Sequence, residues 1–394
     1  MLRTHKIRCY PNATMSRVLD QACDYRRYCY NQALATWNEM YDASVVLADK
    51  TARPNERKVR NELVNNKADW QYRRSARILQ LAVHDLALAW ANFFNPEMPD
   101  HRKPRFKSKK RSCCGFKTDR ATIVNGNLRL DKPQGYRNRW YDIRLAEKPR
   151  WQGTVKLAAI VKEVDGYYAC LSIDVAKPEP LSESQQVCGI DANVGKFVYN
   201  DGEAMSAMRV LTEQLVSLYN RVSLYQRRLA RKRQANPNHF RSNNYRTTKT
   251  KLQRTYQKVT RIQNDLLQKF TTMLVKTNGT LAIEDLDVKH MKMNKRLAKN
   301  LHRSLFGHFK TLLKDKARWY GRQLIIVDRF YPSTQRCSRC GLVKTGDDKL
   351  TLAGNALHGT KHHEFHCYGC GAQLERDENA VQNLIQYAQG QAMP

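Results

Sequence analysis

The chain has 394 residues, and its 69 Lys and Arg against 36 Asp and Glu leave a formal charge of +33 at pH 7. A hydrophobic fraction of 41% excludes a disordered basic tail, and the length predicts two to four domains. A folded protein with this much positive charge repels itself unless a polyanion neutralises it, so nucleic acid is the expected partner. An anionic membrane surface is the rival, but the sequence has no apolar run of about 18 residues that would span a bilayer.

The cysteine content bears on the compartment. The N-terminal residues lack the apolar stretch and the small-residue cleavage site of a secretory signal peptide. We therefore expect a reducing, cytoplasmic compartment. The 11 cysteines, an odd number, are then expected as thiols or metal ligands rather than as a disulfide framework.

The first half of the chain predicts a strand, then helices, then short strands. Residues 3–9 alternate loosely and predict a strand. Apolar residues at helical spacing over 16–94 predict a small helical domain, which three prolines then end. Short β runs separated by turn residues fill 116–175, where Asp165-Gly166 predicts a hairpin.

A different pattern begins near residue 186. It predicts strands at 187–191 and 196–199, followed by a long helical hairpin over 207–276 whose apolar residues repeat with heptad spacing. The elements predicted after this hairpin are a strand at 280–283, a helix over 301–320, a strand at 324–328 and a final amphipathic helix over 378–388.

Two stretches are unusually basic. The first, Arg102–Arg111, follows the helical region. In the second, no acidic residue occurs between Glu213 and Asp265, whereas solvated helices normally interleave both signs. Contact with a nucleic-acid backbone is therefore predicted for both stretches. The side chains predicted to make it are Arg102, Lys103, Arg105, Lys107, Lys109, Lys110, Arg111, Arg227, Arg228, Arg231, Lys232, Arg233, Lys249, Lys251 and Arg254.

Aromatic residues in the helical region have two interpretations. Tyr25, Tyr28, Tyr30 and Trp37 could stack on bases. Aromatic residues at helical spacing belong more often to the core, and that is the interpretation we prefer.

Two C-x-x-C pairs, Cys337 with Cys340 and Cys367 with Cys370, are each followed by a glycine that allows a tight turn. The pattern predicts one tetrahedral Zn²⁺, and four cysteine ligands leave no open position, so this zinc is expected to be structural. One of the four spacer histidines at positions 358, 362, 363 and 366 could replace a cysteine. Unmetallated thiols and a redox pair are less favoured, because no thioredoxin-like βαβ unit surrounds the motif. The other seven cysteines are interpreted as buried thiols.

Three carboxylates lie at the ends of predicted elements. Asp191 and Glu284 close apolar strands, and Asp377 begins the last helix. Each alone is typical of a cap or a turn. Together, in so basic a protein, they predict phosphodiester hydrolysis by two Mg²⁺ ions, because Mg²⁺ prefers carboxylate oxygens and activates both the attacking water and the leaving oxygen.

The motifs occur in a characteristic order. They are Gly189-Ile190-Asp191, then Ile283-Glu284-Asp285-Leu286, then the C-x-x-C pairs, then Arg376-Asp377-x-Asn379-Ala380-x-x-Asn383. In this order, and over essentially the whole chain, the sequence resembles the TnpB family of transposon-encoded, RNA-guided nucleases related to type V CRISPR effectors.

The resemblance implies a multidomain α+β fold. Its RuvC-like domain, of the RNase H fold, would span 184–335 and 375–394 and use Asp191, Glu284 and Asp377 to hold two catalytic Mg²⁺ ions. A zinc ribbon holding one structural Zn²⁺ would be inserted at 336–374. A helical recognition domain would span 16–114, and a wedge-like β-barrel would be built from 1–15 and 115–183.

The implied function is cleavage of complementary double-stranded DNA, next to a short motif, by a protein carrying a guide RNA from the transposon end. The implied location is a prokaryotic cytoplasm, in association with the nucleoid. One alternative is an RNA-guided DNA-binding protein that does not cut, although an intact carboxylate triad argues against it. Another is an RNase H-fold transposase. Against this second alternative, the triad is spaced by 93 residues at each step, whereas many such transposases bring the last two carboxylates closer.

Overall fold

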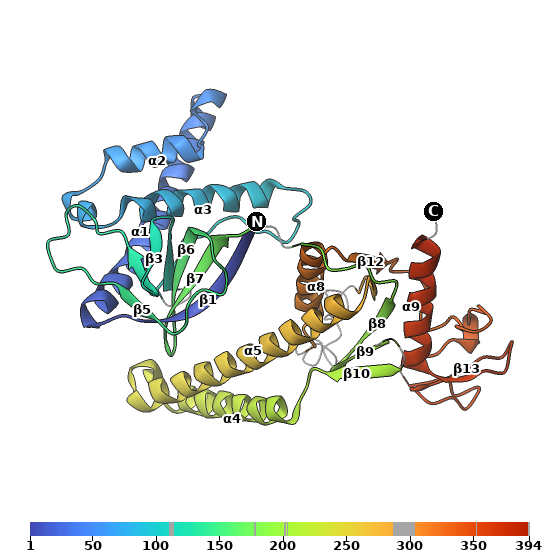
Figure 1. Ribbon diagram of the computed structural model, residues 1–394. Coiled ribbons are helices and arrows are strands. Elements are labelled where there is room, and N and C mark those ends of the chain that lie inside the picture. The colour runs from blue at the N-terminus through green and yellow to red at the C-terminus, as the bar shows by residue number, and fades with distance from the viewer. Residues whose placement is uncertain are drawn as a thin grey trace. The chain divides into compact units, whose positions relative to one another are not determined.

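The computed structural model describes residues 1–109, 114–176, 179–200, 202, 204–286, 304–351 and 353–392. Lys110 and Arg111 of the first basic stretch, Cys113, and the start of the helix predicted over 301–320 lie outside these residues. The chain divides into two compact units, Met1–Lys177 and Pro178–Pro394. The units are described separately below as unit 1 and unit 2 (Figure 1).

Unit 1 contains a seven-stranded antiparallel sheet in the order β2-β6-β7-β1-β5-β4-β3. Its strands are β1 (Leu2–Tyr10), β2 (Cys114–Thr118), β3 (Ala121–Val124), β4 (Asn127–Leu130), β5 (Ile143–Leu145), β6 (Thr154–Glu163) and β7 (Gly166–Asp174). Strand β3 also contacts β6, so the sheet curls into a near-closed barrel. The first predicted strand and the hairpin at Asp165-Gly166 are confirmed.

The helices of unit 1 share one hydrophobic core with this barrel. They are α1 (Ala13–Val46), α2 (Glu56–Asn65) and α3 (Ala76–Phe94), with short 3₁₀ turns at Lys50–Ala52 and Asp69–Arg73. Helix α1 starts where the Asn12 side chain accepts a hydrogen bond from the Met15 amide at 2.8 Å. The preferred core interpretation is confirmed for Tyr25 and Tyr30, which are buried, whereas Tyr28 is 39% exposed.

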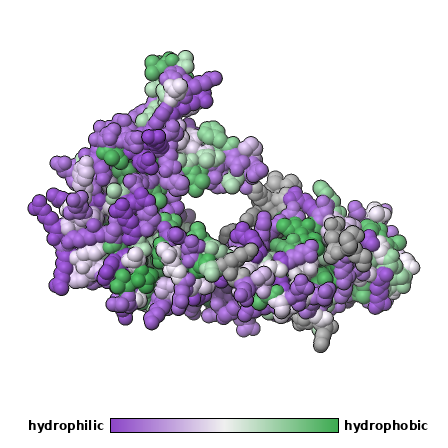
Figure 2. Space-filling view, turned by 45° about the horizontal axis from the view of Figure 1, so that its top comes forward, coloured by the Kyte–Doolittle hydropathy of each residue, from purple (hydrophilic) through white to green (hydrophobic). Residues whose placement is uncertain are grey.

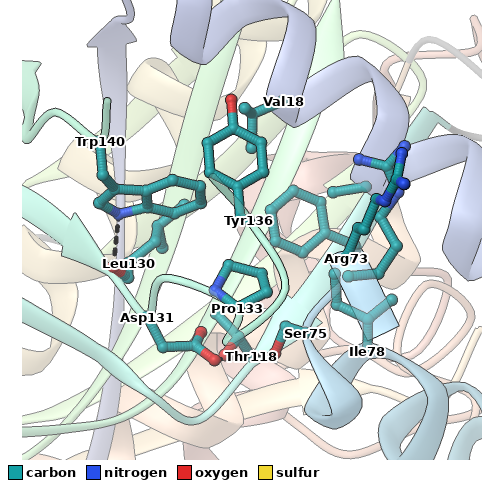
Figure 3. A pocket seen from close by; sticks show the side chains of 13 residues that line it. Val18, Arg73, Ser75, Ile78, Thr118, Leu130, Asp131, Pro133, Tyr136 and Trp140 are labelled. Atoms are coloured by element: carbon teal, nitrogen blue, oxygen red, sulfur yellow. Dashed lines mark hydrogen bonds between the residues drawn. The ribbon is translucent and has the colours of Figure 1, made fainter. Parts of the chain in front are cut away.

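A small cavity lies between α1, the start of α3 and the loop after β4 (Figure 3). Its volume is about 30 Å³, the space of roughly one water molecule. Two hydrogen bonds hold its walls: Ser75 Oγ to Asp131 Oδ2 at 2.9 Å, and Trp140 Nε1 to the Leu130 carbonyl at 2.9 Å. The cavity is therefore a packing defect of the unit 1 core and has no room for a ligand.

Unit 2 is built on a five-stranded mixed sheet in the order β10-β9-β8-β11-β12. The strands are β8 (Val187–Asn193), β9 (Lys196–Asn200), β10 (Met205–Arg209), β11 (Thr280–Glu284) and β12 (Gln323–Val327). The first three run antiparallel, and β11 lies parallel to both β8 and β12. The remaining elements are α4 (Glu213–Ala235), α5 (Asn243–Thr277), α8 (Phe306–Tyr320), β13 (Glu364–His366), β14 (Gln373–Glu375), α9 (Arg376–Ala392), and 3₁₀ turns at His239–Arg241 and Gly346–Asp348.

Helices cover both faces of this sheet (Figure 1). On one face, Ile190 of β8 and Ile283 of β11 pack with residues of α5 and α8. On the other face, Ala282 of β11 and Val198 of β9 pack with residues of α9. Because successive strand residues alternate between faces, the sheet is buried on both sides, as is typical of strands with parallel neighbours.

The long helical hairpin is confirmed, although residues 207–209 belong to β10 and the first helix begins only at Glu213. The predicted heptad positions Leu215, Leu218, Val222 and Leu229 are buried against α5. Hydrophilic residues dominate the molecular face shown in Figure 2. Among the described residues, no helix combines the length and apolar character needed to cross a bilayer.

Helix α9 approaches the sheet closely at one residue of β8. A Cβ atom placed on Gly189 would lie 2.5 Å from the Val381 carbonyl oxygen, which real side chains do not allow. The glycine of the Gly189-Ile190-Asp191 motif is therefore required by the contact with α9. Asp191 lies two residues after Gly189 in the same strand, so this contact with α9 is close to the first candidate carboxylate.

We expect Gly189→Ala to displace α9 and to lower the free energy of unfolding of unit 2 by about 1–3 kcal/mol, the usual cost of overpacking. Urea denaturation followed by circular dichroism measures the change. The matched control is Gly390→Ala, because Gly390 lies in the same helix and a Cβ there meets nothing within 4 Å. This control should cost nothing, since alanine favours helix over glycine. Equal stability of the two variants would contradict the role given to Gly189.

Candidate functional site

The three candidate carboxylates come from three elements of unit 2. In β11, Ile283 pairs with Ile190 of the parallel strand β8, so Glu284 and Asp191 occupy matching positions one residue later. Ile190 and Ile283 face α5 and α8. Because neighbouring strand residues point to opposite faces, Asp191 and Glu284 lie on the face that α9 covers. Asp377 lies in the first turn of α9. The sheet register and the packing of α9 together bring the three carboxylates close to one another.

Each carboxylate is held by a short-range partner. Asn193 Nδ2 donates to Asp191 Oδ2 at 2.6 Å. Ser333 Oγ donates to Glu284 Oε1, and Lys196 Nζ lies 2.7 Å from Asp377 Oδ2. Asp191 and Asp377 are only 4% and 5% exposed. The site is therefore a buried acidic cluster whose side chains are fixed by the surrounding fold.

The cluster is electrostatically unfavourable when all three carboxylates are charged. Burial, followed by the negative charges of Glu284 and Asp377, raises the pKa of Asp191 well above its ordinary value. Burial also raises the pKa of Glu284, against the opposing hydrogen bond from Ser333. A cation is the species that relieves such repulsion, and the hard oxygen donors are those that Mg²⁺ prefers.

One lysine already neutralises part of this charge. Burial acts to lower the pKa of Lys196, but the hydrogen bond and the charge of Asp377 outweigh burial, and the pKa is raised. Lys196 thus stays charged beside the carboxylates. Arg376 adds a second positive group, with its Nη2 atom 3.5 Å from Asp377 Oδ1.

The four predicted cysteine ligands come together in unit 2. The Sγ atoms of Cys337 and Cys370 are 3.8 Å apart, and those of Cys340 and Cys367 are 3.5 Å apart. A tetrahedral zinc with Zn–S bonds of about 2.3 Å would separate its sulfurs by about 3.8 Å. Both distances are close to this value, and all four sulfurs lie within 4.8 Å of one another, so the four cysteines could hold one zinc ion.

This cluster contains no histidine. Over the described ranges, these cysteines are the one group of three or more His, Cys, Asp or Glu side chains whose ligand atoms all lie within 4.8 Å of one another. His358 is instead 2.7 Å from Asp348 Oδ1. The alternative in which a spacer histidine replaces a cysteine is not supported. The oxygens of the three carboxylates do not meet this 4.8 Å limit, so they lie farther from one another than the four sulfurs do.

The two cysteine turns are built alike. The amide of Gly341 donates to the Cys337 carbonyl and the amide of Gly371 to the Cys367 carbonyl, both at 2.9 Å. The two glycines have φ of +79° and +69°, a left-handed conformation that other residues rarely adopt. The predicted requirement for these glycines is confirmed.

Side chains of α9 bind the segment that leads into the first cysteine pair. Asn383 Nδ2 donates to the carbonyls of Ser333 and Arg336 at 2.8 and 2.7 Å. Asn379 donates to the Arg336 carbonyl at 2.7 Å and accepts from the Ser338 amide at 2.9 Å. Since Ser333 also contacts Glu284, one segment connects the cysteine cluster, α9 and a candidate carboxylate.

Sequence reasoning missed these supporting residues. Asn379 and Asn383 were recognised only as parts of a motif, and Ser333 was not singled out. Lys196 carried no signal at all beyond its place at the start of a strand. Two buried asparagines at i and i+4 on one helix face could have indicated a polar contact, because buried amides require partners.

Most of the predicted nucleic-acid-binding side chains are exposed on the surface. In the first stretch, Arg102, Lys103, Arg105 and Lys109 are exposed. Lys107 is different: it is half-buried with its Nζ 3.3 Å from the centre of the Tyr30 ring, and burial lowers its pKa to about 8. In the hairpin, Lys232 is half-buried and binds Asn244 and Thr248. The exposed side chains of the hairpin are Arg227, Arg228, Arg231, Arg233, Lys249, Lys251 and Arg254.

Sequence models of three protein families match this chain. They are described as a helix-turn-helix domain at residues 1–44, a probable transposase at residues 170–295, and a Cas12f1-like TNB domain at residues 306–384. In the structure, residues 1–44 form β1 and most of α1, which is one uninterrupted helix. The third match covers both cysteine pairs and the start of α9.

Two similar proteins match nearly the whole chain, and a third matches about half of it. A protein of Streptomyces pristinaespiralis named "Putative RNA-guided DNA endonuclease" is 29% identical over 97% of this chain and 88% of its own length. The Escherichia coli (strain K12) protein "Putative RNA-guided DNA endonuclease InsQ" is 26% identical over 93% and 88%. The "TnpB-like protein L79" of Acanthamoeba polyphaga mimivirus is 26% identical over 52% and 38%. The predicted resemblance to the TnpB family is confirmed.

The match to the Streptomyces pristinaespiralis protein covers 97% of this chain and therefore extends over both units. Among solved structures, that of a Cas12f1–sgRNA–target DNA complex aligns with 98% of this chain and 99% of that chain, at 15% identity. Its TM-score of 0.35 is too low to support a conclusion about the fold.

The raised pKa of Asp191 predicts a stabilising substitution. The folded protein without Mg²⁺ holds the Asp191 proton more tightly than the unfolded chain does, so stability falls as the pH rises above the ordinary carboxyl range. Asp191→Asn removes that charge and should raise the melting temperature at pH 7.5 in Mg²⁺-free buffer. The gain should shrink as the pH is lowered toward 4.

Asp285→Asn is the control for this experiment. The hydrogen bond from Lys310, at 2.5 Å, lowers the pKa of Asp285, so its ionised form is stabilised by folding. This variant should lose stability at pH 7.5. A destabilised Asp191→Asn at the same pH would show that the acidic cluster carries no electrostatic penalty.

The contact between α9 and the cysteine cluster predicts a second stability difference. Asn383→Ala leaves the Ser333 carbonyl without its donor, while the Arg336 carbonyl keeps the hydrogen bond from Asn379. It should lower the free energy of unfolding of zinc-loaded protein by about 1–3 kcal/mol. Gln386→Ala is the control, because its hydrogen bond to the Ser338 carbonyl is exposed and its loss should cost no more than about 0.5 kcal/mol. Zinc content and urea denaturation are measured together. Indistinguishable variants would rule out the connection.

Proposed function

We propose that this chain is an RNA-guided DNA endonuclease whose RuvC-like domain hydrolyses phosphodiester bonds at Asp191, Glu284 and Asp377. The observation that carries the proposal is the gathering of these carboxylates on one face of the unit 2 sheet, in a chain of charge +33. The two near-full-length relatives both bear the name of an RNA-guided DNA endonuclease. An RNase H-like domain is supported by the mixed sheet, in which an antiparallel β8-β9-β10 set adjoins two parallel strands.

Mg²⁺ would supply the chemistry that carboxylates alone lack, by activating a water molecule and stabilising the leaving oxygen. The residues of the chain hold and orient the oxygen donors. Asn193 fixes Asp191, Ser333 fixes Glu284, and the first turn of α9 presents Asp377. The high pKa of Asp191 supports a cation site, because a divalent ion offsets the repulsion that burial creates.

The surface charges suit a guide and its target. Exposed Lys and Arg side chains occur along both α4 and α5. The sequence between Glu213 and Asp265 has no acidic residue. Such a surface binds phosphates without reading sequence, and base pairing with the guide then selects the DNA. We assign the remaining roles as the resemblance implies, with a wedge-like barrel at 1–15 and 115–183 and a recognition region at 16–114.

The cysteine cluster is proposed to hold a structural zinc. Its four ligands leave no position for a substrate. Its role is to order residues 336–374, which lie between β12 and α9 in the chain. Metal binding there stabilises a segment that has little apolar core of its own.

A second candidate function is transposition by the same carboxylates. The matching family described as a probable transposase favours it. Strand transfer joins a DNA end to a new site, whereas an endonuclease leaves two hydrolysed ends. The products therefore separate the two functions.

The first experiment is expression with the native flanking DNA, purification, and sequencing of the RNA that remains bound. A guided nuclease should retain one RNA species that ends in a variable segment. With that RNA, Mg²⁺ and a complementary duplex, Asp191→Asn, Glu284→Gln and Asp377→Asn should each cut at least about 100-fold more slowly than wild type. Duplex binding should stay within about threefold of wild type.

Asp285→Asn is the matched control, since it removes a neighbouring carboxylate that is paired with Lys310 and Arg329 instead. It should cut at nearly the wild-type rate. Random RNA in the preparation would contradict guide-directed function, a triad variant that cuts normally would remove that residue from the site, and joined DNA products would favour transposition.

A further inference from the structure

Unit 1 contains a second cavity, far larger than the one in Figure 3. Its volume is about 680 Å³, within the range of about 300–1,000 Å³ that is usual for small-ligand sites. It lies between the C-terminal part of α1, the segment around Arg53 and the end of α3. The residues lining it are Trp37, Asn38, Tyr41, Asp42, Arg53, Pro54, Trp90, Phe93, Phe94 and Lys103.

Aromatic rings form a nearly parallel array in this cavity. Trp37 and Trp90 are inclined by 13° with centroids 6.0 Å apart, and Trp90 and Phe94 by 16° with centroids 5.7 Å apart. Phe94 is 69% exposed and Tyr41 is 50% exposed. The array therefore presents flat apolar surfaces to solvent at the mouth of the cavity. A planar, unsaturated ligand would bury them by stacking.

Polar groups in the same cavity have no partners. Among the described residues, the side chains of Asn38, Asp42 and Arg53 make no hydrogen bond or ion pair. The cavity thus offers both donors and an acceptor beside stacking surfaces.

The charge at the rim identifies the class of ligand. Lys103 places its Nζ 5.7 Å from the centre of the Trp90 ring, and it begins the exposed basic stretch with Arg102 and Arg105. Arg53 is exposed on the cavity wall. A planar group attached to an anion satisfies the rings, the unpaired polar atoms and the cations together. A nucleotide is such a ligand, whereas an apolar peptide would leave Asp42 and Arg53 unpaired.

We propose that this cavity binds one unpaired nucleotide, with its base stacked on the Phe94 and Tyr41 rings and its phosphate near Arg53 and Lys103. Asn38 and Asp42 would contact the edge of the base. The nucleotide belongs either to the bound RNA or to the DNA target, so the inference rests on the proposed function. It adds a nucleotide-binding site in unit 1 that is separate from the carboxylates of unit 2.

Ultraviolet cross-linking with mass spectrometry tests the site. The purified protein with its bound RNA is irradiated with and without a complementary duplex, and adducts are mapped. An adduct on a peptide containing Tyr41 or Phe94 before DNA is added assigns an RNA nucleotide. An adduct that requires the duplex assigns a DNA nucleotide. No adduct in either state, with adducts elsewhere on the protein, would overturn the proposal.

Substitutions measure the contribution of the site. Phe94→Ala should weaken binding of the assigned nucleic acid by about 5-fold to 100-fold, as expected for loss of one stacking surface. Leu88→Ala is the control, because Leu88 is 50% exposed on the same helix and does not line the cavity.

The results distinguish this inference from the proposed function. If wild-type protein carries RNA and cuts DNA while Phe94→Ala binds as wild type does, the nucleotide site is wrong and the endonuclease stands. If wild-type protein binds a nucleic acid but does not cut, a loss of affinity in Phe94→Ala still supports the site. Dimers that Phe94→Ala dissolves, with no change in nucleic-acid affinity, would show a contact between copies and overturn the proposal.

Discussion

The close approach of α9 to β8 is the constraint on which the candidate active site depends. Asp191 and Glu284 are neighbours because two parallel strands pair in register, but Asp377 reaches them only because α9 lies directly against the sheet. Gly189 makes that approach possible, since any side chain there would meet the Val381 carbonyl. A backbone contact two residues before Asp191 thus determines whether the third carboxylate can join the site.

Holding three carboxylates together in a buried place opposes folding, and the surrounding residues offset this cost. Lys196 and Arg376 supply positive charge at Asp377, while Asn193 and Ser333 donate to Asp191 and Glu284. The segment that carries Ser333 is in turn bound by two asparagines of α9, on the way to the first cysteine pair. The cysteine cluster and the acidic cluster are therefore parts of one hydrogen-bonded assembly, although thiolate and carboxylate ligands prefer different metals.

Much of unit 2 could be predicted from the sequence. The strands that carry Asp191 and Glu284, the heptad-spaced hairpin and the cysteine turns follow from local periodicity and from residues with special backbone needs. Strand β8, however, continues past Asp191 to Asn193. The five-residue strand β10 was missed, because its sequence Met-Ser-Ala-Met-Arg has no clear alternation. In unit 1, the helical and β regions were predicted as separate domains, whereas α1 and α3 share one core with the barrel. Local patterns indicate which face is apolar and not what covers it.

The sequence by itself determined the chemistry that is available: three carboxylates at element ends, four thiols in two turns, and a large positive charge. These are properties of residue type and spacing, which need no knowledge of distant contacts. Only the tertiary structure decided which partner each group has. It packed Lys107 against Tyr30, paired Asp285 with Lys310, and gathered Trp37, Trp90 and Phe94 around one cavity. Such outcomes depend on residues far apart in the chain, and burial and charge pairing are set only when those residues pack together.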